Sequence, residues 1–363
     1  MGIYIGLIIF ILFLPIMVQP FYKTAEKRRN AIAFWGMLAI FLVLALKGDT
    51  VGYDIAGYKE QYIVSANKAW DDVDYVYFEP GYITLTKIFS KAGVSFQFFM
   101  AFVYALACSS IYFFVKKCSK SPAISILIFI CYQFFVFYVS GVRQTIAMSL
   151  CLIAYMVSQC KAKRVFFISL LINIVAISIH TSAIIFFVVL IFSRVKSKKI
   201  NIVFWIFVIL ASIVFRPLVW ELVNEFFREV DVNTEMLLAG NFIFLCCIGL
   251  FMYFVNPKSN ILQINLKSNS ATDEEEKQNV FFTRMIFVSI CTHILFSGHT
   301  LLRSAMYPMM FIIPGLPNTT RRLESKFRLI AEYAMVVFFI ALFYLETLAS
   351  NQLGICPYIF FWE

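Results

Sequence analysis

Twelve apolar segments alternate with short polar ones along the chain. They cover residues 3–19, 31–46, 95–115, 122–140, 142–159, 165–179, 182–193, 200–215, 237–255, 280–297, 301–317 and 328–346. A helix needs about 20 predominantly apolar residues to cross the hydrocarbon core of a bilayer, and most of these segments approach that length. The pattern predicts an all-α, polytopic integral membrane protein with about 12 transmembrane helices. We expect one transmembrane domain over residues 1–363.

The basic residues predict how these segments cross the membrane. Segments 165–179 and 182–193 are short, so they form either a hairpin of two crossings or one kinked span. With the N-terminus outside and two crossings, most of the 31 Lys and Arg residues fall in cytoplasmic loops, as the positive-inside rule requires. A single span would place the basic cluster 194–199 outside. We therefore predict two crossings.

Composition excludes a soluble protein and argues against nucleic acid as a partner. Apolar residues make up 61% of the chain and charged residues 14%, whereas soluble domains carry about 25% charged residues. The net charge of +10 comes largely from short clusters between apolar segments. That placement is typical of the orientation signal of a membrane protein. The first apolar segment lacks a basic n-region and a cleavage site, so we expect it to remain as a span.

Three polar regions are longer than the other connections. The first outer loop covers 47–94, and within it FEPGYITLTKIFSKAG predicts a turn and a short amphipathic helix starting at Pro80. The second outer loop covers 216–236, where Leu218, Leu222, Val223 and Phe226 recur at helical spacing, which predicts an amphipathic helix on the membrane surface. The polar loop 256–279 is expected to be cytoplasmic.

Ionisable residues gather near the predicted outer boundary, although they are far apart in sequence. They are Asp49, Asp54, Glu79, Arg143, His180 and Arg303. A snorkelling Arg or an interfacial His explains any one of them singly. Their shared depth favours a common site, because charged groups at membrane depth are costly and usually face a cavity. Arg284 lies near the inner end of its segment, where snorkelling explains it.

The chemistry that suits these residues is transfer from a pyrophosphate-linked lipid. Arg pairs with phosphate oxygens in a bidentate manner and stabilises the negative charge of a diphosphate leaving group. A sugar hydroxyl acting as nucleophile needs a base, which His180 or a carboxylate such as Glu79 supplies. The sequence has no metal-ligand cluster and no nucleotide-binding fingerprint, so we expect no cofactor and no metal, although Asp49 and Asp54 leave room for a divalent ion.

An ordered set of motifs resembles the EpsG-type polysaccharide polymerases, which are relatives in function of the Wzy O-antigen and capsule polymerases. The motifs are KGDTVGYDIAGYKEQY, FEPGY, GVRQTIAMSL, SIHTSAII and RSAMYPMMFIIP, and together they cover about 47–317. The GVRQ motif followed by an H-[TYS]-S-A step carries most of the specificity. The C-terminal CPYIFFWE matches no motif.

The resemblance implies a glycosyltransferase at the outer face of a bacterial inner membrane. It would transfer a glycan from undecaprenyl diphosphate to a second lipid-linked repeat unit, with a chain-length regulator as a partner. On this basis the catalytic candidates are Glu79, Arg143, His180 and Arg303, with the two Arg residues holding diphosphates. The candidates for substrate binding are Asp49, Asp54, Tyr58 and Gln144.

The sequence leaves other classes of membrane protein open. A flippase for the lipid-linked unit would line the full membrane depth with polar groups, whereas the charges here gather at one face. An O-antigen ligase would carry its longer outer loop between late spans, whereas the longer outer loop here, 47–94, comes early in the chain. A membrane O-acyltransferase also uses a His, but the pair of Arg residues argues for a diphosphate substrate.

Overall fold

The computed structural model describes residues 1–72, 78–160, 162–195, 197, 199–226, 235–255, 272–298, 300–351 and 353–363. Within these ranges the regular elements are helices, and one isolated antiparallel pairing joins Lys47 to Phe360. The chain divides into two compact units. Unit 1 contains Met1–Ala183 and Glu332–Glu363, and unit 2 contains Ile184–Ala331.

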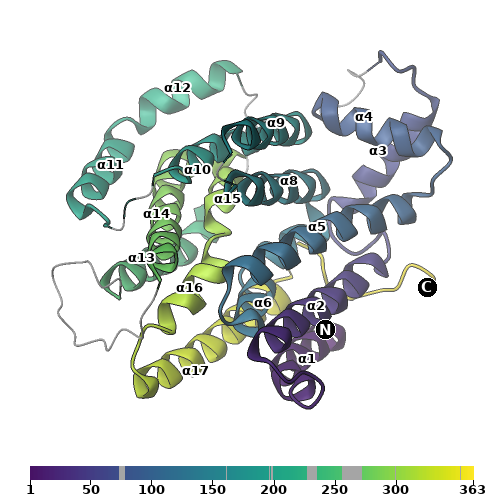
Figure 1. Cartoon of the computed structure of the whole chain (residues 1–363). Helices are drawn as coiled ribbons and strands as arrows, with labels where there is room; N and C mark the ends of the chain where they lie inside the picture. Colours follow the sequence, from purple (N-terminus) through teal and green to yellow (C-terminus); the bar gives the residue numbers. More distant parts are fainter. Residues whose placement is uncertain are drawn as a thin grey trace. The chain divides into compact units, whose positions relative to one another are not determined.

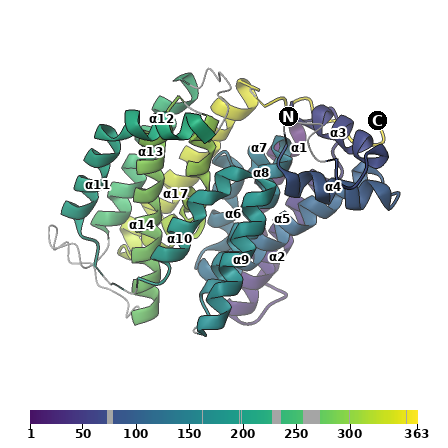
Figure 2. The same ribbon diagram turned by 90° about the horizontal axis from the view of Figure 1, so that it is seen from above.

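Unit 1 is built on three long neighbouring helices. Its elements are α1 (Gly2–Val18), α2 (Ala25–Ala45), α3 (Ile55–Asn67), α4 (Pro80–Lys91), α5 (Phe96–Cys118), α6 (Pro122–Cys131), α7 (Phe134–Ser140), α8 (Val142–Ser158) and α9 (Lys163–Ile179). Helix α5 packs against both α2 and α8, and α9 lies along α8, as Figures 1 and 2 show. The short helix α4 packs on both α3 and α9. These contacts bring the first predicted outer loop to α9.

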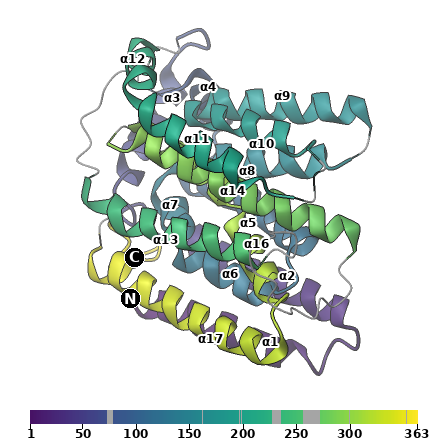
Figure 3. The ribbon, with the colours of Figure 1, turned by 90° about the vertical axis from the view of Figure 1, so that its left-hand side faces the viewer.

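Unit 2 is built around α14. The 3₁₀ turn η1 (Thr181–Ile185) starts in unit 1 and ends in unit 2. It is followed by α10 (Phe186–Phe192), α11 (Ile202–Val214), α12 (Arg216–Phe226), α13 (Glu235–Phe254), α14 (Asp273–Phe296), the 3₁₀ turn η2 (Thr300–Ala305), α15 (Met306–Met309) and α16 (Ile312–Thr320). Helices α11 and α13 pack against α14, as Figure 3 shows. Helix α17 (Ser325–Leu342) and a π turn (Phe343–Ala349) lead back into unit 1.

The all-α prediction is confirmed for the described residues, and part of the predicted membrane crossing is supported. Four helices there are long and apolar enough to span a bilayer: Ala25–Ala45, Phe96–Cys118, Asp273–Phe296 and Ser325–Ala349. The count rises to six if two bent pairs each form one span, with bends of 55° between α6 and α7 and 58° in Ile202–Val223. Other predicted spans coincide with shorter apolar helices, so twelve crossings stay a prediction.

The loops contain more helix than the hydropathy pattern predicts. Helix α4 starts at Pro80 as predicted, whereas the pattern does not predict α3. A helix is present over Arg216–Phe226, and its position on the membrane surface stays a prediction. Helix α14 begins at Asp273, within the predicted polar loop 256–279, whose place on the cytoplasmic side stays a prediction. Residues 256–271 of that loop lie outside the described residues.

The C-terminal segment holds the start of the first predicted outer loop. Four backbone hydrogen bonds join the two: Gly48 to Ile359 at 2.8 Å, Gly52 to Gly354 at 2.9 Å, Tyr53 to Leu353 at 3.2 Å and Phe361 to Leu46 at 3.0 Å. Gly52 has φ = +101°, and a Cβ there would lie 3.1 Å from the Val139 carbonyl oxygen. Only glycine accepts this conformation and this approach without strain. The C-terminal segment therefore holds the turn before α3 in place, and Gly52 lets this turn pack against the end of α7.

Candidate functional site

Glu79 is the centre of a hydrogen-bonded group contributed by three segments of unit 1. Its Oε1 lies 2.8 Å from Nδ1 of His180 and accepts a hydrogen bond from the backbone N–H of Thr181 at 3.1 Å. Its Oε2 forms an ion pair with Nη1 of Arg143. The side chains of Glu79, His180 and Arg143 are 12%, 16% and 20% exposed. We call Glu79, Arg143, His180 and Thr181 the Glu79 centre.

Local sequence explains how α4 and α9 bring Glu79 to His180. Pro80 occupies the first position of α4, where its missing N–H costs nothing, and Glu79 is the N-cap residue. His180 is the C-cap of α9 and adopts an extended backbone conformation. Gly81 permits the contact between the two helix ends, because a Cβ there would lie 2.6 Å from the backbone oxygen of Ser178. No larger residue fits without moving one helix.

Arg143 is held on several sides. It is the second residue of α8, directly after Gly141 and Val142. Its guanidinium lies 4.2 Å from the ring centroid of Phe78, a cation–π contact, and its Nε donates to the hydroxyl of Tyr58 at 3.4 Å. Because a guanidinium carries five N–H donors, these contacts leave donors for an anionic ligand.

The charges of the centre fix the protonation of Glu79. Burial alone would raise the pKa of this carboxyl, but the hydrogen bond from His180 and the positive charge of Arg143 outweigh it and lower the pKa to about 2. An ionised carboxylate only accepts hydrogen bonds, so Nδ1 of His180 must donate to it. In the neutral imidazole, Nε2 then carries the lone pair and is able to accept a proton.

The remaining candidates in unit 1 have different environments. Tyr58 is buried and contacts Arg143. Asp49 forms an ion pair with Lys59, and Asp54 precedes α3, with its backbone N–H donating to Oγ of Ser140 at 3.3 Å. Gln144 is buried on α8, where it points about 100° away from Arg143 around the helix axis. Substrate binding by Asp49, Asp54, Tyr58 and Gln144 stays a prediction.

Arg303 belongs to unit 2 and is exposed on the 3₁₀ turn η2. This turn packs against α14, and the hydroxyl of Ser289 donates to the carbonyl oxygen of Ala305 at 2.9 Å. Arg143 lies in unit 1. Convergence of Arg143 and Arg303 on one ligand therefore stays a prediction.

Three residues of the site are not among the functional candidates that the sequence indicates. Phe78 and Thr181 each stand next to a candidate, within the quoted motifs FEPGY and SIHTSAII. Tyr82 is fully buried, and its ring lies 5.7 Å from that of Tyr58 and 5.6 Å from that of Phe78. The sequence signal that could have found Phe78 and Thr181 is their position directly beside Glu79 and His180.

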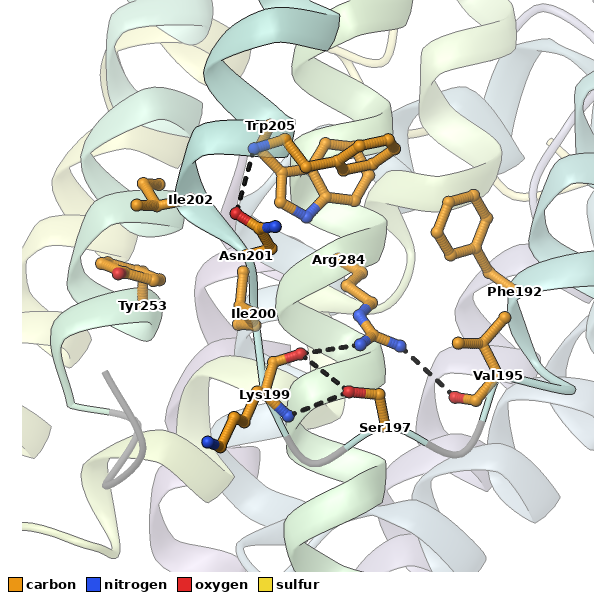
Figure 4. Close-up of a pocket in the computed structure, with 11 residues that line it drawn as sticks. Phe192, Val195, Ser197, Lys199, Ile200, Asn201, Ile202, Trp205, Tyr253 and Arg284 are labelled. Atoms are coloured by element: carbon orange, nitrogen blue, oxygen red, sulfur yellow. Dashed lines mark hydrogen bonds between the residues drawn. The ribbon is translucent and has the colours of Figure 1, made fainter. Parts of the chain in front are cut away.

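Unit 2 contains a separate cavity of about 580 Å³ beside the loop between α10 and α11 (Figure 4). The buried Arg284 guanidinium donates to the carbonyl oxygens of Val195 at 3.3 Å and Lys199 at 2.8 Å. The Arg284 donors thus hold this loop, and snorkelling of Arg284 to the headgroups stays a prediction. Trp205 forms one wall, stacked between Phe192 and Phe287.

No group of three or more His, Cys, Asp or Glu residues suited to a metal ion occurs in the described part of the chain.

Among known proteins, the sequence profile described as "EpsG family" matches residues 31–360. Searches of curated proteins and of solved structures find no match. The matched range includes the whole Glu79 centre and most of the chain. The chain therefore belongs to the EpsG family.

Proposed function

We propose that this protein polymerises lipid-linked oligosaccharide repeat units at the outer face of the bacterial inner membrane. The family indicates a polysaccharide polymerase. The donor in our proposal is a glycan on undecaprenyl diphosphate, and the acceptor is a repeat unit on a second carrier lipid. The observation that carries the proposal is the Glu79 carboxylate, which orients His180 and also fixes Arg143.

The proposed reaction is one glycosyl transfer. The bond between C1 of the donor sugar and the diphosphate oxygen breaks, and its electron pair leaves with undecaprenyl diphosphate. A hydroxyl oxygen of the acceptor sugar forms the new bond to C1. The proton of that hydroxyl passes to Nε2 of His180, which acts as a general base. Removal of the proton in the transition state makes the hydroxyl a better nucleophile.

Glu79 is better suited to positioning than to accepting this proton. With a pKa of about 2, its carboxylate has little affinity for a proton near neutral pH. Its hydrogen bond instead selects the His180 tautomer that leaves Nε2 unprotonated, and its negative charge stabilises the imidazolium formed during transfer. The backbone N–H of Thr181 fixes the same carboxylate oxygen.

Arg143 is the proposed phosphate ligand. A fixed guanidinium stabilises negative charge as it develops on the diphosphate, without reorganising during the reaction. Phe78 and Glu79 hold Arg143 in place before substrate binds. In our proposal Arg303 supplies a second guanidinium to the same diphosphate.

Deletion of the gene separates polymerisation from the other functions. Loss of a polymerase leaves single repeat units attached to their final acceptor, which appear as one band on a gel of the surface glycan. Loss of a flippase or of a ligase leaves no glycan attached. We expect the single-unit band, and restoration of the ladder when the gene is returned. A deletion strain without any attached unit would contradict the proposal and favour the flippase or ligase.

A further inference from the structure

A groove in unit 1 lies at the ends of α2, α5 and α8 opposite to the Glu79 centre. Its volume of about 780 Å³ falls within the range of about 300–1,000 Å³ that is typical of ligand sites. Along α8, Arg143 lies at the start and Met156 of the groove lies near the end. At 1.5 Å per residue these two positions are separated by roughly 20 Å along the helix axis. The groove is therefore distinct from the proposed catalytic site.

One face of each helix lines the groove. On α5 the lining residues include Leu106, Ser109 and Phe113, and on α8 they include Ile153 and Val157. Residues three or four positions apart share a face of a helix, so each set forms a continuous stripe. The short side chain of Ser109 leaves space between its larger apolar neighbours. An acyl chain is the kind of ligand that such an apolar trough accommodates.

Positive charge gathers at the polar end of the groove. Arg29 comes from the second turn of α2, and Lys116 and Lys117 come from the last turn of α5. Nζ of Lys117 donates to the carbonyl oxygen of Met156 at 3.4 Å, which places this ammonium at the C-terminal end of α8. Among the described residues that line the groove, Glu26 is the one carboxylate. The lining therefore carries more positive than negative charge.

We propose that this groove binds one anionic diacyl phospholipid. Its phosphate would lie against Arg29, Lys116 and Lys117, and one acyl chain would follow the apolar stripes of α5 and α8. Charge complementarity favours an anionic lipid, since each Lys or Arg near the membrane surface contributes about a fivefold gain in binding. The predicted topology places these cations at the cytoplasmic leaflet, across the membrane from the glycosyl transfer.

The test measures lipid retained by the purified full-length chain in detergent, by native mass spectrometry and by the thermal unfolding midpoint. The probes are phosphatidylglycerol, phosphatidylcholine with the same acyl chains, and soluble glycerol 3-phosphate. The variant R29Q/K116Q/K117Q removes the three groove cations. Its control, K23Q/K27Q/R164Q, removes the same charge from residues outside the lining. S109F fills the trough without changing any charge.

We expect phosphatidylglycerol to bind at least about tenfold more tightly than phosphatidylcholine. This preference should disappear in R29Q/K116Q/K117Q and persist in K23Q/K27Q/R164Q. S109F should weaken retention of both lipids, because it occupies the place of the acyl chain. Equal retention of the two lipids by the unmodified chain would overturn the proposal. So would equal losses in the two triple variants, or stabilisation by glycerol 3-phosphate that matches the lipid.

Discussion

Nδ1 of His180 lies 2.8 Å from Oε1 of Glu79, although the two residues are 101 positions apart in the chain. The pair forms where the N-terminus of α4 meets the C-terminus of α9. Both residues are candidates for the base. Glu79 is held as a carboxylate by Arg143 and Thr181, so our proposal gives the proton exchange to His180.

Replacement of His180 by Ala should nearly abolish polymerisation. A general base contributes roughly 10²–10⁴-fold to a rate, and Ala supplies no proton acceptor. We expect a loss of that size in the transfer rate with a purified lipid-linked repeat unit, at unchanged protein abundance. Full-length polymer made by His180→Ala would remove this residue from the mechanism.

Arg143→Lys should shorten or abolish the glycan chains. Lys keeps the positive charge but lacks the planar fork that contacts Phe78, Glu79 and Tyr58 together. Glycan length on a gel and protein abundance on a blot provide the readout. The matched control is Arg164→Lys on α9, an exposed position outside the site. Normal chain lengths in Arg143→Lys would count against the phosphate role.

Gly81→Ala should inactivate the protein although Gly81 bears no chemistry. The added Cβ would lie 2.6 Å from the Ser178 backbone oxygen, so α4 must shift away from α9. A displacement of about 1 Å at a catalytic group is able to cost 10²-fold in rate. Gly57→Ala on α3 is the control, because a Cβ there meets no atom within 4 Å. Comparable activity of the two variants would argue that the α4–α9 contact does not position Glu79.

Lys47 should make stability depend on pH. Its side chain is buried, and burial lowers its pKa from 10.5 to about 7, partly opposed by the nearby charge of Asp49. Between those values the unfolded chain binds more protons than the folded one, so stability rises as pH increases from about 7 towards 10.5. One such group contributes a slope of up to about 1.4 kcal/mol per pH unit.

The measurement is the thermal unfolding midpoint at pH 7 and pH 9 for the wild-type chain and for Lys47→Met. We expect the wild-type midpoint to rise more than that of the variant over this interval. Lys47→Met also removes the 2.8 Å hydrogen bond to the carbonyl oxygen of Val51, so its absolute stability is less informative than the slope. Parallel changes in the two proteins would show that Lys47 is charged in the folded state.

The sequence predicts the helices better than the contacts between them. Apolar segments are local patterns, and they coincide with helices such as α2 and α5. In contrast, the hydropathy pattern misses α3 because polar residues interrupt it, although Ile55, Tyr58 and Tyr62 are buried at helical spacing. The start of α14 precedes its apolar segment and is marked by a capping residue instead, since Oγ1 of Thr272 accepts from the N–H of Glu275.

The composition of the candidate site is also more predictable than its geometry. A shared depth near the outer boundary groups Glu79, Arg143 and His180 from the sequence alone, but it groups Asp49, Asp54 and Arg303 with them as well. The ion pair and the hydrogen bonds among them depend on the close approach at Gly81, which no local pattern encodes. The partners of Arg284 are likewise hidden from the sequence, because hydropathy does not reveal that they are loop carbonyl oxygens.

The most direct test of the central claim, that Glu79 acts through His180, is a double-mutant cycle. Transfer rates are measured for the wild-type chain, Glu79→Gln, His180→Ala and the double variant, with one purified lipid-linked repeat unit. If Glu79 positions the base, Glu79→Gln should slow the wild-type chain by at least about tenfold and slow His180→Ala far less. An equal factor in both backgrounds would show that the two residues act independently, and would contradict the account.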